Sequence, residues 1–439
     1  MSLAITSVAI AIAAGLYWYV NRQKRIKHIL SDLRMALDMQ GAGAGGLIDD
    51  WINVRRNKVV LPDANSKVAV ITGGARGIGT EVVRGLLKSK MTVIMGIRKP
   101  ELVKKLAETM ENGDKLHAFP LDLQSMRSVK EFAEAVLKEF PEIHLLVNNA
   151  GIMFGEYKLT EDGFETQLAV NYLGHFYLTH LLLPALKKTG TKVKPSRIVN
   201  VTSCAHFPGY IYFDDINFKE HYDTTSAYAQ SKLAQLMSAR YIDKILEQDG
   251  EYVKCYSVHP GIVDTDLFEK SNFKKFPWLM KMFFKTAEKG AVSILYACFD
   301  KDIEDKGGLY ISNCREGISS RYSQNFNHQN KLFEISCNLL GIDVENSSSR
   351  EALDPREHSD RLDMVLEKDP PHTHTCLLSC GHCTISKAVS TAAGRPGPTT
   401  TVALGGITFN SCLRSWRPIV SLIYNFFCVN SRSTSTQDT

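Results

Sequence analysis

Short apolar runs alternate along the chain with segments in which apolar residues recur every three or four positions. Val68–Ile71, Met91–Ile97 and Ile143–Val147 are runs of the first kind, and their length is typical of buried strands. Glu81–Lys88 shows the helical period. Strands and helices alternate in this way over residues 66–345, which predicts an α/β domain with a doubly wound parallel sheet. Ligands of such sheets bind beyond the carboxyl ends of the strands.

The amino-terminal segment has a different pattern. Leu3 to Val20 carries no charge and has about the minimum length that spans hydrocarbon, and four cations follow it: Arg22, Lys24, Arg25 and Lys27. We therefore predict an uncleaved membrane anchor over residues 1–21, with a lumenal amino terminus and the α/β domain in the cytosol. A cleaved signal peptide on a secreted protein is the alternative. Residues 22–65 are predicted to be a basic flank and linker, with a hinge at Gly41–Gly46.

The carboxyl-terminal segment, residues 346–439, is of low complexity. Ser-rich and Pro-rich stretches there, including Pro370-Pro371 and 394–401, predict a disordered tail. The tail also holds several possible metal ligands, but they follow no regular spacing and we predict no metal site: His372, His374, Cys376, Cys380 and Cys383.

Composition fits one packed domain with flanking segments. The chain has 439 residues, of which 44% are hydrophobic and 23% charged. The net charge of +5 gathers near the amino terminus rather than in a stripe, so nucleic-acid binding is not predicted. The scattered cysteines suit a reducing compartment.

A glycine-rich turn follows the first strand. Thr72-Gly-Gly-Ala-Arg-Gly-Ile-Gly79 places Gly73, Gly77 and Gly79 between a strand and a helix, with Ile78 inside the turn. Glycines at this spacing allow a tight turn and close approach of a pyrophosphate to the helix amino terminus. The sequence thus predicts a Rossmann-like dinucleotide site.

The end of the second strand indicates which dinucleotide binds. The strand is followed by Arg98-Lys99, and Arg76 lies in the glycine turn on the same side. A carboxylate at this place would bind the ribose 2′-OH of NAD(H), whereas cations accommodate a 2′-phosphate. We therefore predict NADP(H) rather than NAD(H), with Arg76 and Arg98 as ligands; ordinary solvated loop charges are the alternative.

Tyr228 and Lys232 form the most informative pair in the chain. On a helix, positions i and i+4 share a face. A phenol, whose unperturbed pKa is roughly 10, then lies beside an ammonium that favours phenolate. Such a tyrosine can exchange a proton with a carbinol or carbonyl oxygen. We expect the ammonium to lower the pKa of Tyr228.

Together these motifs resemble the classical short-chain dehydrogenase/reductase family over about residues 66–340. The resemblance implies a catalytic tetrad of Asn171, Ser203, Tyr228 and Lys232, with Thr202 as a rival hydroxyl to Ser203. In the same way it implies further cofactor contacts besides Tyr228 and Lys232: the adenine-binding pair Asp122 and Leu123, Asn149 in Asn148-Asn-Ala-Gly151, and Pro260, Gly261 and Thr265 near the nicotinamide.

Within that family, Asn171-Tyr-Leu-Gly-His-Phe176 and His259–Leu267 look most like the membrane-associated retinol dehydrogenase branch, which is implicated in polyprenol and dolichol metabolism. The resemblance implies a lipophilic alcohol or its carbonyl as substrate (retinoid, polyprenol or steroid) and an endoplasmic reticulum membrane. The alternative from another class is a non-catalytic, membrane-tethered nucleotide-binding or scaffold protein. The oligomeric state is not predicted.

Overall fold

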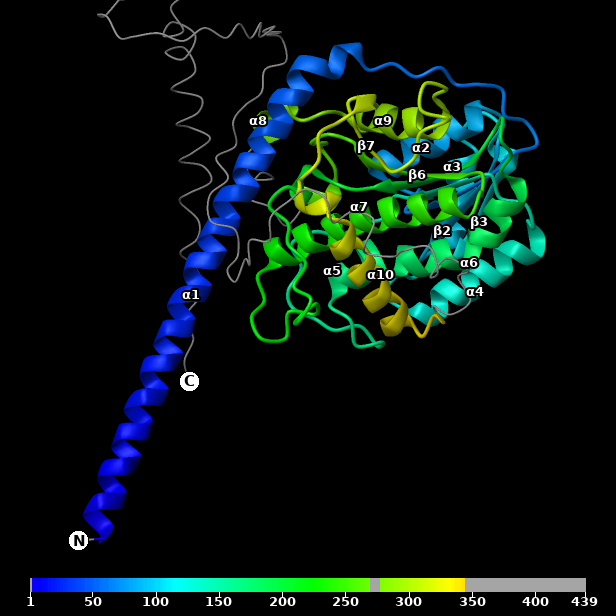
Figure 1. The fold of residues 1–439 in the computed structure, drawn as a ribbon. Helices are drawn as coiled ribbons and strands as arrows, with labels where there is room; N and C mark the ends of the chain where they lie inside the picture. Colours follow the sequence, from blue (N-terminus) through cyan, green and yellow to red (C-terminus); the bar gives the residue numbers. More distant parts are fainter. Residues whose placement is uncertain (1, 269–276, 344–439) are drawn as a thin grey trace, which may run out of the picture. The chain divides into compact units, whose positions relative to one another are not determined.

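A computed structural model describes residues 2–268 and 277–343; for residues 2–20, Pro277 and Leu279 only the backbone is described. The predicted tail, residues 346–439, and its histidines and cysteines lie outside these ranges. Within them, the chain forms one sheet with helices on both faces (Figure 1). The predicted α/β architecture is confirmed.

The sheet has the strand order β3-β2-β1-β4-β5-β6-β7-β8. All neighbours are parallel except the β7–β8 pair. The strands are β1 (Val68–Thr72), β2 (Thr92–Ile97), β3 (Leu116–Pro120), β4 (Leu145–Asn148), β5 (Ser196–Val201), β6 (Val253–His259), β7 (Leu309–Ser312) and β8 (Arg315–Glu316). The chain reverses its direction of travel between β1 and β4, the switch point at which doubly wound sheets bind dinucleotides.

Side chains alternate across the sheet and create two hydrophobic cores. Ala69 and Ile71 of β1 point into one core, and Val70 points into the other. The first core is covered by α2 (Gly77–Lys88), α3 (Val103–Ala107) and α9 (Ala287–Phe299). The second is covered by α4 (Met126–Glu139), α6 (Gly174–Thr189) and α7 (Thr224–Gln248), as Figure 1 shows.

Shorter elements complete the domain. The helix α10 (Phe326–Leu340) packs on α7 through Leu332 and Cys337. The remaining elements are η1 (Val54–Arg56), η2 (Pro100–Leu102), η3 (Gly113–Lys115), α5 (Thr166–Leu168), the π-helix η4 (Ala169–Leu173), η5 (Cys204–His206), η6 (Asp266–Phe268), α8 (Pro277–Phe283) and η8 (Tyr322–Gln324).

The amino-terminal region is helical well beyond the predicted anchor. Helix α1 spans Ser2–Asn53, so the hinge predicted at Gly41–Gly46 is wrong, and most of the predicted linker is helix. Gly46 explains part of this difference, because a Cβ atom there would lie 3.4 Å from Cys204 Sγ. The glycine lets α1 approach η5 closely, and that packing offsets its low helix propensity.

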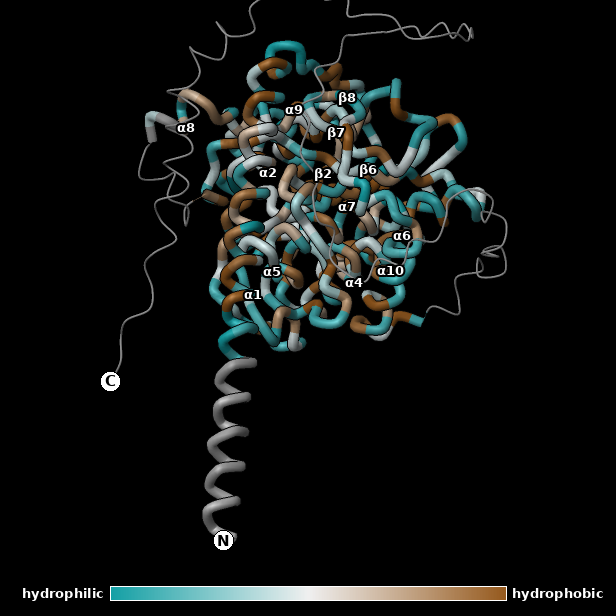
Figure 2. Tube along the Cα trace, turned by 60° about the vertical axis from the view of Figure 1, so that its left-hand side comes forward, coloured by the Kyte–Doolittle hydropathy of each residue, from teal (hydrophilic) through white to brown (hydrophobic). Residues whose placement is uncertain are grey.

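Two faces of α1 differ in character. Brown and teal positions alternate along its described part in Figure 2. Met35 is buried and Met39 packs near Tyr228, whereas the opposite face exposes Ile26, Ile29, Leu30, Leu33 and Leu37. Among the described residues, no helix combines the length and the apolar composition that crossing a bilayer requires.

Candidate active site

The glycine turn joins β1 to α2 as the sequence predicts. Gly73 and Gly77 have φ values of +68° and +56°, a region that L side chains rarely adopt. A Cβ atom on Gly79 would lie 2.2 Å from the carbonyl oxygen of Gly73, so the turn closes only with glycine at that position. Arg76 is the N-cap of α2, and its side chain does not cap the helix. The backbone N–H groups of this 12-residue helix can therefore receive an anion, which fits a dinucleotide pyrophosphate.

The end of β4 is bonded to its neighbours on both sides. Asn149 Nδ2 donates to the carbonyl oxygens of Thr72 (2.9 Å) and Gly73 (3.1 Å). Asn148 Nδ2 donates to Asn200 Oδ1 (2.9 Å) on β5. These bonds hold together the carboxyl ends of β1, β4 and β5, and one of them reaches Gly73 of the glycine turn.

Three of the four predicted tetrad side chains are buried together near the ends of β4 and β5. Tyr228 and Lys232 lie on α7, and Asn171 lies in the π-helix. Ser203 follows β5, and its hydroxyl lies close enough to the phenol of Tyr228 to lower the pKa of that group. A Cβ atom on Gly151 would lie 3.3 Å from Asn171 Oδ1 and 3.4 Å from Lys232 Nζ, so these two side chains meet at one backbone position. A π-helical turn often marks a functional site.

Thr202 and Ser203 are distinguished by their partners. Thr202 Oγ1 donates to the backbone oxygen of Lys232 at 2.7 Å and is buried. Ser203 Oγ accepts a bond from the N–H of Ala205 at 3.2 Å and also lowers the pKa of Tyr228, which places it near that phenol. The Thr202 hydroxyl therefore already donates its proton to the backbone of α7, whereas the Ser203 hydroxyl lies near the phenol.

Burial, rather than the neighbouring cation, dominates the ionisation of this pair. Burial raises the pKa of Tyr228 well above its usual value, and the nearby hydroxyl of Ser203 lowers it only in part. The expectation of a lowered pKa for Tyr228 is therefore wrong, because burial outweighs any effect of the neighbouring ammonium. Burial also lowers the pKa of Lys232 to about 7. Both shifts follow from the cost of a charge in a low-dielectric interior.

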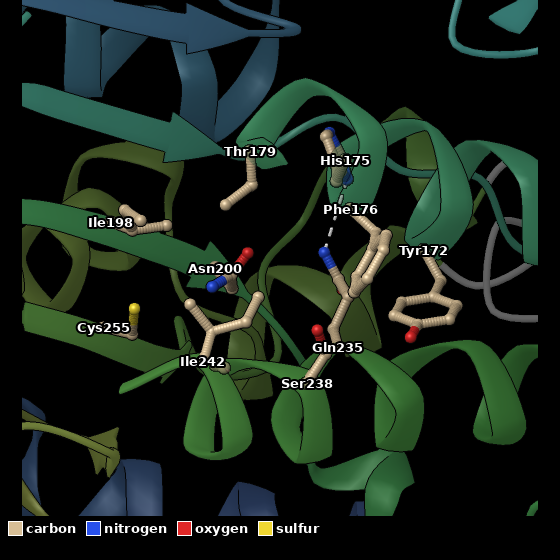
Figure 3. Close-up of a pocket in the computed structure, with 11 residues that line it drawn as sticks. Tyr172, His175, Phe176, Thr179, Ile198, Asn200, Gln235, Ser238, Ile242 and Cys255 are labelled. Atoms are coloured by element: carbon tan, nitrogen blue, oxygen red, sulfur yellow. Dashed lines mark hydrogen bonds between the residues drawn. The ribbon is translucent and has the colours of Figure 1, made fainter. Parts of the chain in front are cut away.

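A chain of buried polar groups extends behind Lys232. Lys232 Nζ donates to Gln235 Oε1 (3.0 Å), and Gln235 Nε2 lies 3.4 Å from His175 Nδ1. His175 Nε2 lies 2.9 Å from Thr72 Oγ1, which accepts the N–H groups of Asn149 and Ala150. Figure 3 shows Gln235 and His175 facing each other at the edge of a small cavity. This cluster of buried polar groups thus extends from Lys232 to Thr72, the last residue of β1.

The two predicted 2′-phosphate ligands lie on exposed loops. Arg98 follows β2 and is exposed. Arg76 is also exposed, with Nη1 3.5 Å from Asp266 Oδ2. Beyond β3, Leu123 is buried and Asp122 Oδ1 accepts the N–H of Gln124 (3.0 Å). Each of these residues follows the carboxyl end of a strand or lies in the glycine turn.

The segment after β6 passes between the glycine turn and Tyr228. Gly261 follows Pro260 and has a φ of +95°. A Cβ atom on Gly77 would lie 3.3 Å from Thr265 Cγ2, and one on Gly290 would lie 3.4 Å from Ile78. Further along, Leu267 and Phe268 pack against the group that contains Tyr228.

Apolar side chains surround Tyr228. Met153, Ala205 and Tyr228 are buried together, and four partly buried residues pack on them: Met39, Phe154, Leu267 and Phe268. The Phe154 ring centroid lies 6.3 Å from that of Tyr228, and the Phe154 backbone is left-handed, with φ +60°. A strained aromatic residue beside a candidate acid is consistent with a functional position.

Comparison with known proteins identifies the family. Residues 67–275 match the short chain dehydrogenase family. Polyprenol dehydrogenase from Danio rerio is 39% identical over 327 residues, covering 72% of this chain and 99% of that protein. Retinol dehydrogenase 12 from Homo sapiens is 39% identical over 293 residues, covering 66% of this chain and 90% of that protein. The chain therefore belongs to the short-chain dehydrogenase family and is an oxidoreductase of the kind that binds a nicotinamide dinucleotide.

Solved structures agree with the fold. The crystal structure of an uncharacterized protein from Mycobacterium Paratuberculosis superposes with a TM-score of 0.52 and 31% identity, covering 64% of this chain and 96% of that one.

The resemblance to the retinol dehydrogenase branch is likewise confirmed, since Retinol dehydrogenase 11 from Homo sapiens is 38% identical over 283 residues, 64% of this chain and 87% of that protein.

Sequence reasoning missed several residues of this site. His175 and Gln235 were not predicted, although both lie on helices whose other residues were: Gln235 is three positions after Lys232 and His175 is four after Asn171. Helical spacing from the tetrad is the signal that could have found them. Met39 gave no such signal, because it comes from a helix far away in sequence.

Proposed function

We propose that this protein interconverts a lipophilic alcohol and its carbonyl compound, with NADP(H) as cofactor and Tyr228 as the acid and base. The observation that carries the proposal is the burial of the Tyr228 phenol in an apolar group, close enough to the Ser203 hydroxyl for the serine to lower its pKa, beside a turn fitted to a dinucleotide. Relatives named for polyprenol and retinol, both lipophilic alcohols, support the same substrate class.

The chemistry divides between the cofactor and the chain. A bound nicotinamide dinucleotide gives or accepts a hydride at the substrate carbon. In the reductive direction, Tyr228 Oη donates its proton to the substrate oxygen, and Ser203 Oγ holds that oxygen by a hydrogen bond. The raised pKa of Tyr228 keeps the phenol protonated at neutral pH, which is the state that reduction needs. Oxidation follows the same path in reverse.

Lys232 has two tasks in this proposal. Its ammonium binds the nicotinamide ribose and favours the phenolate that oxidation requires. Burial lowers the pKa of this amine to about 7, so it holds its proton less firmly than an exposed lysine does. The negative charge of a bound dinucleotide favours the ammonium form of Lys232, so cofactor binding would increase the share of this form. Asn171 and a water molecule connect this group to solvent.

The preference for NADP(H) is supported by charge. Arg76 and Arg98 are both exposed beside the glycine turn and the end of β2, where a ribose 2′-phosphate would lie. Asp266 is the acidic partner of Arg76 at 3.5 Å, an exposed pair that contributes little and that a phosphate can replace.

Membrane attachment through residues 1–21 is also part of the proposal. The uncharged run Leu3–Val20, the four cations after it and the exposed apolar face of α1 support it. We propose the endoplasmic reticulum membrane, with a cytosolic catalytic domain. If full-length protein were released from microsomes by alkaline carbonate as readily as a variant without residues 1–21, the attachment would be disproved.

A turnover assay tests the activity. Microsomes that contain the full-length protein are supplied with NADPH or NADH and with a panel of retinoid, steroid and polyprenol carbonyls, and the reverse reaction is measured with NADP⁺. We expect turnover of at least one lipophilic class, faster with NADPH than with NADH. No turnover of any lipophilic substrate above that of the Tyr228→Phe variant would contradict the proposal.

A further inference from the structure

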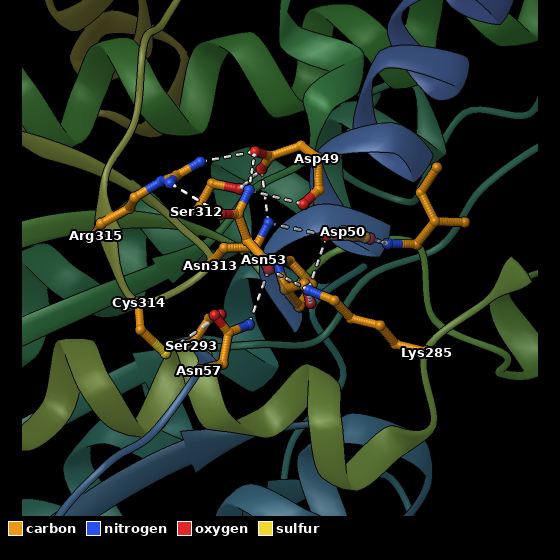
Figure 4. A network of polar contacts seen from close by, with 12 residues as sticks. Asp49, Asp50, Asn53, Asn57, Lys285, Ser293, Ser312, Asn313, Cys314 and Arg315 are labelled. Carbon is orange, nitrogen blue, oxygen red and sulfur yellow. Dashed lines mark hydrogen bonds and ion pairs between the residues drawn. The ribbon is translucent and has the colours of Figure 1, made fainter. Parts of the chain in front are cut away.

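The carboxyl end of α1 carries a buried carboxylate that contacts three donor groups. Asp50 Oδ1 lies 2.8 Å from Lys285 Nζ and accepts Asn313 Nδ2 at 3.1 Å, while Oδ2 accepts the N–H of Ile262 at 2.8 Å. Asp50 and Lys285 are only 3% and 4% exposed. Figure 4 shows Asp50 and Asn313 at the centre of this network, with the Lys285 side chain reaching into it.

The two main partners of Asp50 are bonded to each other. The N–H of Lys285 donates to the carbonyl oxygen of Ile262 at 2.8 Å, and the N–H of Asp264 donates to that of Lys285 at 2.9 Å. Lys285 Nζ also reaches the carbonyl oxygen of Pro260 at 3.3 Å. Asp50 lies more than 200 residues before Ile262 in the sequence. Through its bonds to Ile262 and Lys285, it therefore fixes both of the backbone segments that pair here.

That backbone leads directly across the candidate active site. Thr265, three residues after Ile262, lies against Gly77 of the glycine turn. Leu267 and Phe268 then pack beside Tyr228. A shift of Ile262 would thus move the residues that lie between the dinucleotide turn and the phenol.

Stability alone is a weak reason for such a pair. Burying two charges costs desolvation free energy that their attraction often fails to recover, and an apolar pair of similar volume is commonly as stable. An apolar side chain could not replace the carboxylate in its contacts. The carboxylate accepts the Ile262 N–H and also holds the Lys285 ammonium within reach of the Pro260 carbonyl oxygen.

We propose that Asp50 is a positioning residue for the nicotinamide half of the cofactor site. The inference rests on the proposed function, which puts the nicotinamide against Pro260, Gly261 and Thr265. In this proposal α1 positions residues of the active site through Asp50, in addition to its proposed role in membrane attachment.

The test compares two nucleotides on purified full-length protein in detergent. NADPH contains the nicotinamide, whereas adenosine 2′,5′-bisphosphate carries only the adenine, ribose and phosphate groups. Dissociation constants are measured by isothermal titration calorimetry for wild type, Asp50→Asn and Asp49→Asn. Asp49 is the matched control, because it lies next to Asp50 and shares Asn313 with it, but its other bonds go to Ser312, Arg315 and Asn53 rather than to Ile262 and Lys285.

Asp50→Asn keeps the size of the side chain and has one acceptor oxygen instead of two. Its amide N–H groups then face either Ile262 N–H or the donors of Lys285 and Asn313. We expect the dissociation constant of NADPH to rise about 10-fold, the equivalent of one lost hydrogen bond to a charged group, with no change for the bisphosphate. Asp49→Asn should leave both constants unchanged.

A double variant separates positioning from stability. Asp50→Leu with Lys285→Met replaces the ion pair by apolar groups, so it should unfold near the wild-type temperature and still lose NADPH affinity. Equal losses for both nucleotides, or unchanged NADPH binding in either Asp50 variant, would overturn the proposal. A wild-type protein that binds neither nucleotide would instead contradict the proposed function.

Discussion

The ammonium nitrogen of Lys232 lies 2.9 Å from the carbonyl oxygen of Val201, the last residue of β5. This bond joins the middle of α7 to the end of the strand that leads into Ser203. The amine is buried, its other partner is the neutral amide of Gln235, and burial lowers its pKa to about 7. A group held in this way is costly to bury, which suits a functional role better than a structural one.

Stability should therefore depend on pH through Lys232. Between pH 7 and the unfolded pKa of roughly 10.5, the unfolded chain holds this proton and the folded chain does not, so the contribution of Lys232 to stability improves as pH rises. Below pH 7 both states are protonated, and the cost of burial is fully present. Lys232→Met removes this cost.

We thus expect the melting temperature of Lys232→Met, relative to wild type, to be higher at pH 6 than at pH 10. Thermal unfolding of both proteins at the two pH values measures the difference. A relative melting temperature that is the same at both values, or higher at pH 10, would show that the amine is not held in a low-dielectric site.

His175 should make the protein sensitive to acid. Burial lowers its pKa to about 3, so below pH 6.5 the unfolded chain takes up a proton that the folded chain refuses. His175→Leu should cost about 1–3 kcal/mol at pH 7, because Thr72 and the carbonyl oxygen of Asn171 lose a buried partner. Urea unfolding at pH 7 and pH 4.5 measures the free energy of unfolding, and the difference between wild type and variant should be smaller at pH 4.5. A larger difference at pH 4.5 would contradict the assignment of His175 as a buried, neutral side chain.

Cofactor selectivity should depend on the two exposed arginines. Replacing Arg76 and Arg98 together by alanine should weaken NADPH binding by at least about 10-fold and leave NADH binding nearly unchanged, since only NADPH carries the 2′-phosphate. Arg127→Ala, on the exposed surface of α4, is the matched control. If NADPH and NADH lost affinity equally, these cations would not be reading the phosphate.

Much of this architecture could be predicted because it is written in local patterns. The apolar runs fix the strands, and the glycine spacing between a strand and a helix fixes the turn. Tyr228 and Lys232 fall on one helix as their spacing predicts. These features depend on neighbours within about 15 residues, which one sequence displays directly.

What escaped prediction depends on contacts between distant segments. The glycines at 41–46 predicted a hinge, yet α1 is continuous through them. In the fold, Gly46 packs on η5, and Asp50 bonds Ile262 and Lys285. The pKa of Tyr228 was predicted in the wrong direction because burial depends on the whole fold, whereas spacing shows only the neighbouring charge. The His175–Gln235 contact likewise joins two helices 60 residues apart.

The central claim is that the Tyr228 phenol moves a proton at the substrate oxygen, and Tyr228→Phe tests it most directly. The variant keeps the ring that packs against Phe154 and removes only the hydroxyl, so folding and NADPH binding should persist. Tyr252→Phe, on an exposed loop, controls for loss of a phenol elsewhere. In the microsomal turnover assay we predict a loss of at least about 10²-fold in kcat for Tyr228→Phe, with NADPH affinity and Tyr252→Phe turnover unchanged. Turnover by Tyr228→Phe within a few-fold of wild type would contradict the account.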